Sequence, residues 1–171
     1  MNDFDVMNGF NVMNGYDDMD DMDDHRLREQ FDAVLAEFGD LFKLELVLDD
    51  EATVTFTIDD DIIVNLQYLE ESDVVVAFSP VGAFGGIDVA GAGEKALALL
   101  RLNELGGATE GFTLALDEDA DLIMAMDRRG ALDISSADAL AAWMEALVHA
   151  VHAVRDYFAA NFPIDNEGGR D

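Results

Sequence analysis

The sequence contains no cysteine, and only two of its 171 residues are proline. Without cysteine there is no disulfide framework, no thiolate nucleophile and no cysteine-based zinc site. No run of about 18 apolar residues exists that could form a transmembrane helix. The first residues are acidic, where a secretory signal would be basic and then apolar. We therefore expect the protein to stay in the cytosol.

Basic residues are also scarce, because nine Lys and Arg oppose 38 Asp and Glu, for a formal net charge of −29. A surface with this balance repels the phosphates of nucleic acids and the head groups of anionic lipids. We expect neither nucleic acid nor a membrane as a partner. Half of the residues are hydrophobic, so the acidity coexists with a composition that folds, and the length fits one domain with a sizeable core.

The N-terminal segment, residues 1–24, is compositionally biased. VMNGF at residues 6–10 recurs as VMNGY at residues 12–16, and DDMDDMDD follows. Charge repulsion and the Asn-Gly turn pairs favour a disordered acidic tail. An Asp-rich tract could also attract calcium, but the spacing of an EF-hand loop is not met. The predicted organisation is this tail, a folded domain over residues 25–162, and a flexible C-terminal tail over residues 163–171.

Two segments have the periodicity of amphipathic helices. In residues 25–39 one face carries Leu27, Phe31, Val34, Leu35 and Phe38. A longer helix begins at the capping pair Ser135 and Asp138 and ends before Pro163. Its apolar face carries Leu140, Trp143, Leu147, Val151, Val154 and Phe158.

Alternating apolar and polar residues predict five short β-strands. The first three follow one another closely, which indicates an antiparallel meander, and the last two form a hairpin. The expected strands are residues 52–58, 62–69, 74–79, 112–116 and 122–126.

Residues 95–105, between the meander and the hairpin, predict a short helix whose apolar residues point in nearly every direction. Such a helix must be buried on more than one side. In a chain this small, a second copy of the protein is the simplest cover for the second side. We therefore predict a homodimer whose interface includes Leu97, Leu99, Leu100, Leu102 and Leu105.

Three motifs that suggest ligand sites fit ordinary structure better. The glycine-rich residues 80–93 lack both the G-x-G-x-x-G and the GK[ST] patterns. DEDAD at residues 117–121 is followed by Leu122 and Arg128 where a calcium loop needs Gly and Glu. A helical stripe could gather metal ligands, but no second cluster completes a shell; it consists of Glu145, His149, His152 and Asp156. We predict no metal and no cofactor.

The serine residues offer no catalytic pairing with a base. They occur in turn or cap contexts, and nothing suggests a pocket that would orient a histidine beside them. We therefore expect that the protein is not an enzyme. The serines considered are Ser72, Ser79, Ser135 and Ser136.

The elements follow the order α-β-β-β-α-β-β-α, which indicates an α+β domain with an antiparallel sheet and three helices. Four features occur in sequence: the amphipathic first helix, TVTFTIDDDIIVNLQYLEESDVVVAFSPVG, LLRLNELGGATEGFTLALDEDADLIMAM, and the small, acidic composition. Together they resemble the class I type III secretion chaperones, the Tir-chaperone or CesT-like family. The resemblance covers about residues 27–158.

This resemblance implies a cytoplasmic homodimer that binds one secreted effector near the effector's N-terminus and keeps that segment extended and competent for export. It also implies that the helix over residues 95–105 supplies the dimer contact. Independently, an open antiparallel sheet has edge strands that can accept a strand from a partner, with apolar grooves for alternate side chains. The candidate partner-binding residues, which also suit an ordinary core, are Phe31, Leu35, Phe38, Val54 and Phe56.

Two other functions remain open from the sequence. A regulatory binding module on the same fold would look nearly identical, because a fold does not determine a function. An acidic mimic of nucleic acid that sequesters a basic protein would account for the net charge. Binding by such a mimic should weaken steeply with salt, whereas binding of an apolar segment should persist.

Overall fold

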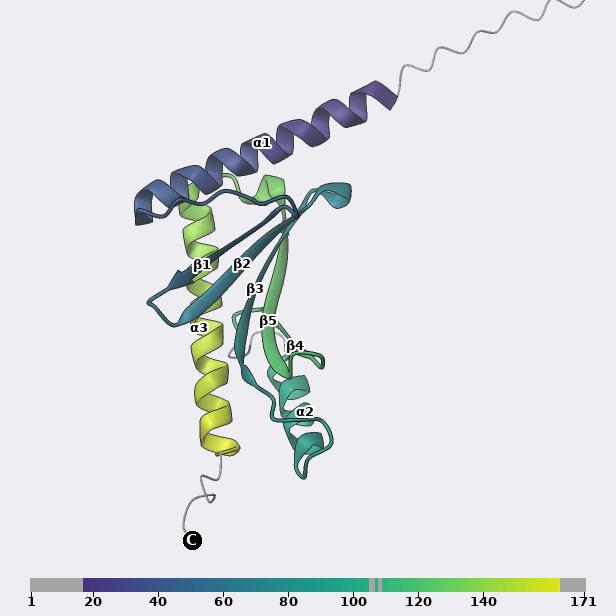
Figure 1. The fold of residues 1–171 in the computed structure, drawn as a ribbon, viewed down its shortest axis with the longest axis vertical. Helices are drawn as coiled ribbons and strands as arrows, with labels where there is room; N and C mark the ends of the chain where they lie inside the picture. The colour runs from purple at the N-terminus through teal and green to yellow at the C-terminus, as the bar shows by residue number, and fades with distance from the viewer. Residues whose placement is uncertain (1–16, 105–106, 108, 164–171) are drawn as a thin grey trace, which may run out of the picture.

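The computed structural model describes residues 17–104, 107 and 109–163. Within them the chain forms three α-helices and a five-stranded antiparallel sheet (Figure 1), and the predicted α+β order is confirmed. In chain order the elements are α1 (Asp17–Phe42), β1 (Thr53–Ile58), β2 (Ile62–Leu69), β3 (Val74–Ala83), α2 (Ala92–Leu102), β4 (Thr113–Asp117), β5 (Leu122–Gly130) and α3 (Ala137–Asn161). Two single turns of 3₁₀ helix follow β2 and β5.

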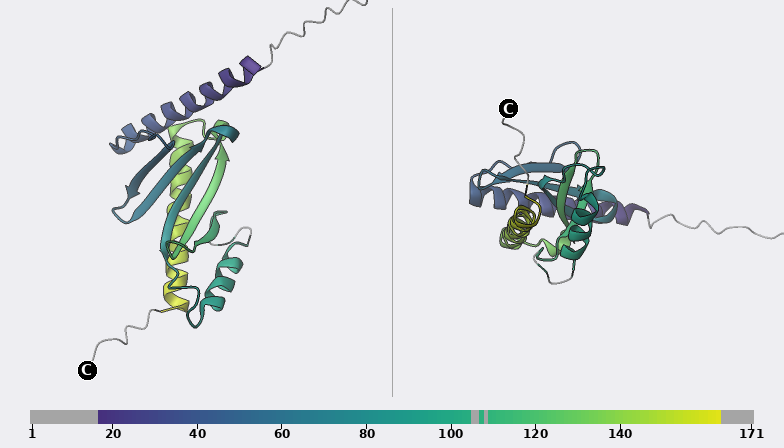
Figure 2. Two further views of the ribbon diagram at one scale, coloured as in Figure 1. Left: turned by 45° about the vertical axis from the view of Figure 1, so that its right-hand side comes forward. Right: turned by 90° about the horizontal axis from the view of Figure 1, so that it is seen from below.

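The strands are ordered β1-β2-β3-β5-β4, and every neighbouring pair is antiparallel. Helix α3 runs along one face of the sheet, which we call the inner face, and α1 lies across one end of the sheet (Figures 1 and 2). The inner face is apolar because every second strand residue points into it. It meets the apolar side of α3, where Trp143, Leu147 and Val151 are fully buried.

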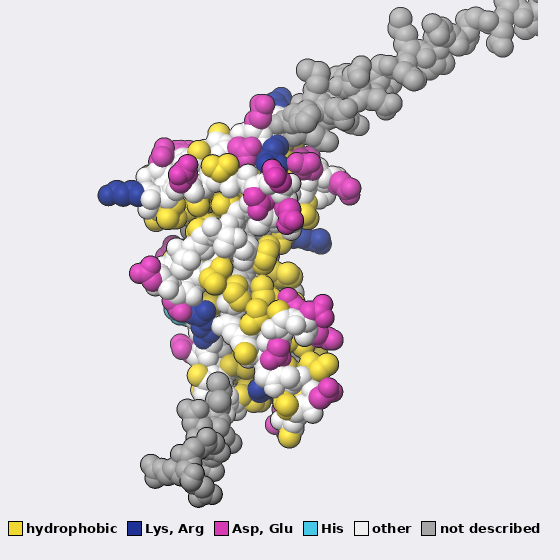
Figure 3. Space-filling model, viewed as in Figure 1, with side chains coloured by type: hydrophobic (Ala, Val, Ile, Leu, Met, Phe, Trp, Pro, Cys, Tyr) yellow, Lys and Arg dark blue, Asp and Glu magenta, His cyan; other side chains and the backbone are white. Residues whose placement is uncertain are grey.

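The opposite, outer face of the sheet has none of the described helices over it. Apolar side chains gather in the middle of this face, with acidic side chains around them (Figure 3). They are half-buried by their neighbours on adjacent strands and include Val76, Phe78, Met124 and Met126. The domain therefore consists of two layers, a sheet and helices on one side of it.

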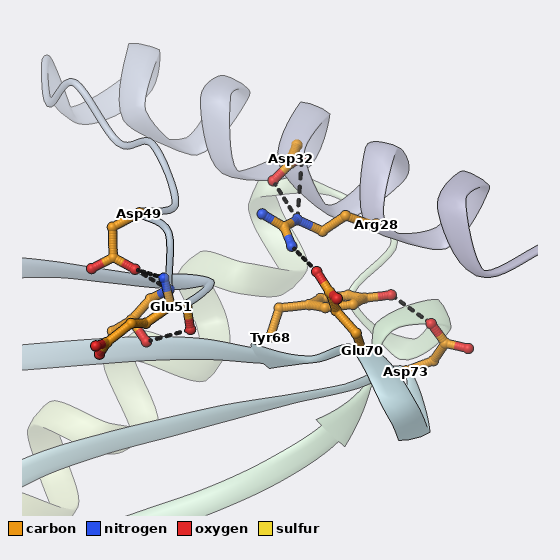
Figure 4. A network of polar contacts seen from close by, with 8 residues as sticks. Arg28, Asp32, Asp49, Glu51, Tyr68, Glu70 and Asp73 are labelled. Atoms are coloured by element: carbon orange, nitrogen blue, oxygen red, sulfur yellow. Dashed lines mark hydrogen bonds and ion pairs between the residues drawn. The ribbon is translucent and has the colours of Figure 1, made fainter. Parts of the chain in front are cut away.

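Helix α1 is held on the sheet by aromatic contacts and by charged contacts, and Figure 4 shows the charged contacts of Arg28. The rings of Phe31 and Tyr68 lie 5.8 Å apart, and the Arg28 guanidinium sits 5.3 Å from the Tyr68 ring centroid. Arg28 also contacts the carboxylates of Asp32 and Glu70 at 3.3 and 3.0 Å. Exposed ion pairs contribute little on their own, so the buried aromatic pair supplies most of this attachment.

Helix α1 begins at Asp17, eight residues before the start that the sequence predicts at His25. Acidic residues near a helix N-terminus interact favourably with the helix dipole. This term favours a helical start at Asp17, and the acidic tail over residues 1–24 stays a prediction. The predictions for residues 1–16 and 164–171 lie outside the described residues.

Strand β3 and helix α2 also differ from their predicted limits. Strand β3 continues through Pro80 to Ala83, where it is still paired with β5. Its pairing with β2 ends at Phe78, so the N–H that Pro80 lacks is not needed for a hydrogen bond to β2. Helix α2 begins three residues early and ends at Leu102. It ends there because the Asn103 side chain donates to the Leu114 C=O at 3.1 Å and accepts from the Leu114 N–H at 2.6 Å.

A buried serine provides a test of the inner face. The Ser79 hydroxyl is fully buried and has no hydrogen-bonding partner among the described residues. Ser79→Ala should raise the free energy of unfolding by about 1 kcal/mol, because a buried hydroxyl without a partner is costly. The melting temperature should rise by about 2–4 °C in calorimetry.

The matched control is Ser136→Ala. The Ser136 hydroxyl accepts a hydrogen bond from the Ala139 N–H at 3.2 Å at the start of α3. Its removal should lower the free energy of unfolding by about 1 kcal/mol. Equal destabilisation by both substitutions would show that Ser79 has a partner after all.

Candidate partner-binding site

Strand β1 is the edge of the sheet, and its hydrogen bonds define which residues face outward. The Tyr68 N–H donates to the Ala52 C=O, and the Asp61 N–H donates to the Ile58 C=O. Residues along an antiparallel strand alternate in the direction of their backbone groups. The backbone N–H and C=O groups of the even-numbered residues of β1 therefore point toward β2. The backbone groups of Thr53, Thr55 and Thr57 point away from the sheet.

Asp49 closes the first part of this edge (Figure 4). Its carboxylate accepts the N–H groups of Glu51 and Thr53, both at 2.9 Å. Its own N–H donates to the Thr53 C=O at 2.9 Å. In the described part of the chain, the outward backbone groups of Thr55 and Thr57 have no such partner. The open edge is therefore two residues long.

A pocket of about 750 Å³ lies beside this open edge. It is bounded by the end of α1, the inner side of β1 and the first half of α3. We call it the β1 pocket. It is lined by Phe38, Phe42, Leu44, Phe56, Thr57, Ile58, Asp59, Asp138, Ala141, Ala142, Met144, Glu145, Val148 and His149.

The wall of the β1 pocket nearest α1 is aromatic. Phe38 and Phe56 are buried, with ring centroids 5.9 Å apart, and Phe42 lies 4.8 Å from Phe38. Phe42 is 55% exposed, which is unusual for a side chain that gains so much free energy from burial. An apolar side chain entering the pocket would therefore find an aromatic surface already in place.

Acidic side chains border the same pocket. Asp59 comes from the turn after β1, and Asp138 and Glu145 come from α3; all three are exposed. The tip of the β1–β2 hairpin is tied to α3 by an ion pair between Asp61 and Arg155. Among the described residues that line the pocket, His149 alone can become positively charged. The pocket thus combines an apolar interior with a negative border.

The five predicted partner-binding residues are all buried in the core. Phe38 and Phe56 also line the β1 pocket. Phe31, Leu35 and Val54 do not, and they fill the space between α1 and the inner face instead. The structure thus brings two of the five together at the open edge, while the role of the set in binding stays a prediction.

The residues predicted for the dimer interface fall on different sides of α2. Leu99 is buried in this chain's own core and Leu102 is half-buried against it. Leu97 and Leu100 are 48% and 70% exposed. Leu105 lies outside the described residues. The helix is thus buried on one side by its own chain and presents two leucines on the other.

The stripe considered for metal binding is split by the fold. Glu145 and His149 line the β1 pocket, whereas His152 and Asp156 are exposed beyond it. The described residues contain no group of three or more potential ligands arranged for a metal ion. None of the described helices is long and apolar enough to cross a membrane.

Sequence reasoning missed the α3 side of the pocket. Ala141, Ala142 and Val148 line it, yet they belong neither to the apolar core face of α3 nor to its polar stripe. Small apolar residues between the two faces of a long helix were the available signal. They leave room beside β1 where a larger side chain would close the pocket.

The direction of the edge can be tested with proline. Thr57→Pro removes an N–H that faces solvent. Its free energy of unfolding should therefore be lower than that of Thr57→Ala by less than about 1 kcal/mol. Phe56→Pro removes an N–H that is bonded to β2. Its free energy of unfolding should therefore be about 1–3 kcal/mol lower than that of Phe56→Ala. Urea unfolding of the four variants measures both differences. A larger penalty at Thr57 than at Phe56 would reverse the assigned direction of the edge.

The comparisons with known proteins agree on the family and the fold. The sequence matches the model of the Tir chaperone protein (CesT) family over residues 33–155. A search of curated protein sequences gives no significant match.

Three solved structures illustrate the likeness. A chain in the structure of the HopA1–SchA chaperone–effector complex is similar with a TM-score of 0.58 at 21% identity, over 75% of this chain and 95% of that chain. The ExsC–ExsE complex gives 0.62 at 20% identity, over 81% and 98%. The Yersinia pestis type III secretion chaperone SycH, solved with a stable fragment of YscM2, gives 0.54 at 25% identity, over 72% and 97%. Since the family model spans most of the folded domain, this chain belongs to the Tir chaperone protein (CesT) family.

Proposed function

We propose that this protein is a type III secretion chaperone that binds the N-terminal segment of a secreted effector in extended form and keeps it competent for export. The observation that carries this proposal is the open edge of β1 at Thr55 and Thr57 directly beside the apolar β1 pocket. The protein works in the cytoplasm and performs no catalysis. Solved relatives in complex with effectors support the proposal.

The edge and the pocket have complementary roles. The backbone groups of Thr55 and Thr57 form main-chain hydrogen bonds with an added strand, which gives affinity without demanding a particular sequence. Successive side chains of that strand point to opposite faces, so every second one enters the β1 pocket. The pocket therefore selects a segment with apolar residues at alternate positions.

Strand addition also explains how the effector segment is kept ready for export. A segment that pairs with β1 must be extended, and its apolar side chains lie against Phe42 and Phe56 instead of in the effector's own core. It cannot fold into its native structure while it is bound. Since each buried apolar side chain contributes about 1.5–3 kcal/mol, a few of them in the pocket suffice to hold the segment reversibly.

The working form is a homodimer assembled through α2. Leu97 and Leu100 are exposed on one side of this helix, and Ile87 and Val89 in the preceding loop are about half exposed. Two copies related by a twofold axis would cover both sets at once. The interface lies at the opposite end of the sheet order from β1, so dimerisation leaves the β1 edge accessible.

Co-expression with the products of neighbouring genes tests the proposed function. We expect a complex that survives purification in high salt and contains two copies of this chain per effector by light scattering. Ala142→Trp fills the β1 pocket and should abolish the complex, whereas Ala159→Trp, on an exposed part of α3 away from the pocket, should not. A complex that dissociates in high salt would instead indicate an acidic mimic.

The dimer is tested separately. The double variant Leu97→Asp/Leu100→Asp places charges on the exposed side of α2, so it should give a folded monomer in light scattering, with unchanged circular dichroism. Leu132→Asp is the control, because Leu132 is similarly exposed at 65% but lies in the turn before α3. A dimer in the double variant would exclude this side of α2 as the interface.

A further inference from the structure

We infer that the segment bound in the β1 pocket carries a lysine or arginine among its apolar residues, and that Asp59, Asp138 and Glu145 select for it. This inference rests on the proposed function, since it concerns the same pocket. It adds a charge requirement that strand pairing and apolar contact do not impose.

The three carboxylates that border the β1 pocket have no cationic partner among the described residues. Several other acidic residues of the described chain form ion pairs, each with an arginine: Asp32, Asp61, Glu70 and Asp127. No ion pair within the described residues involves Asp59, Asp138 or Glu145. No described lysine or arginine lines the β1 pocket.

Asp59, Asp138 and Glu145 are placed so that their negative charges would be close to any segment bound in the β1 pocket. Asp138 and Glu145 lie seven residues apart on α3, about 10 Å along the helix axis, and both face the pocket. Asp59 approaches from the β1–β2 turn. An inserted side chain is therefore close to negative charge from two separate elements.

Binding converts these solvated charges into covered ones. A neutral strand lying over the pocket would strip water from the carboxylates without replacing it, which costs free energy. An acidic strand would add repulsion. A basic side chain offsets the lost hydration of the carboxylates and replaces the repulsion by attraction. A positively charged segment also associates faster with a negative pocket.

The same charges argue against the other available occupants. A second copy of this chain carries a net charge of −29, and residues 1–24 contain eight Asp with no Lys or Arg. Either would bring more negative charge to the border of the pocket. A basic, otherwise apolar segment from a different protein is the occupant that fits.

Three matched peptides test the inference. Each has twelve residues that alternate Thr with apolar residues, with blocked termini and a fluorescent label, and they differ only at one central apolar-face position: Lys, Met or Glu. With the full chain, fluorescence anisotropy should show the Lys peptide binding about tenfold tighter than the Met peptide, and the Glu peptide binding most weakly. Equal affinity of all three would overturn the inference.

Charge reversal in the protein provides the second arm. Glu145→Lys and Asp59→Lys should each reduce the preference for the Lys peptide, and together they should make the Glu peptide the tighter ligand. Glu118→Lys is the control, because it makes the same charge change in the exposed turn between β4 and β5. If it shifts the preference as much as Glu145→Lys, the net charge of the protein and not the pocket is responsible, and the inference fails.

The Ala142→Trp variant separates this inference from the proposed function. If it abolishes binding of a peptide set that shows no charge preference, the pocket binds strands and only the charge requirement is wrong. If it leaves binding of every peptide unchanged, or if no peptide binds, the pocket is not the binding site and both fall together.

Discussion

The packing of α3 along the inner face of the sheet is the interaction on which the rest of the structure depends. Trp143 reaches the sheet with its ring buried, and its indole N–H donates to the Asp127 carboxylate at 2.9 Å. The guanidinium of Arg129 covers the same ring at 4.8 Å. A single helix is too narrow to cover five strands, so β1 relies on α1, which diverges from α3 and leaves the β1 pocket between them.

This geometry leaves an edge of the sheet that can pair with a partner strand but can also cause aggregation. An open strand edge invites pairing with any other extended chain, including another copy of the same protein. Asp49 closes one of the three outward-facing positions of β1 by binding the backbone of Thr53. The large negative charge also opposes such pairing, because two copies of such an edge repel each other. Within the described part of the chain, Thr55 and Thr57 keep open backbone groups on this edge, and under the proposed function they would set the register of a partner.

Local patterns in the sequence predicted the elements because alternation and helical periodicity record which side of each element is buried. They could not predict limits decided by distant contacts. Asn103 ends α2 through Leu114, and Pro80 can lie within β3 because the pairing of β3 with β2 has already ended at Phe78. The site was predicted only in part for a similar reason. Phe31 and Phe38 share one helical face, and only the position of β1 separates a core residue from a pocket residue.

The negative charge of the protein affects binding most directly at the β1 pocket. Nine Lys and Arg cannot pair with 38 Asp and Glu, so most carboxylates stay in water, where being unpaired costs little. That changes only where a partner covers them. An apolar pocket alone would accept many extended segments, because apolar contact is not directional. Under the inferred charge requirement, placing Asp59, Asp138 and Glu145 around the pocket makes the cost of covering those carboxylates depend on the partner's sequence, so these residues would discriminate among partners.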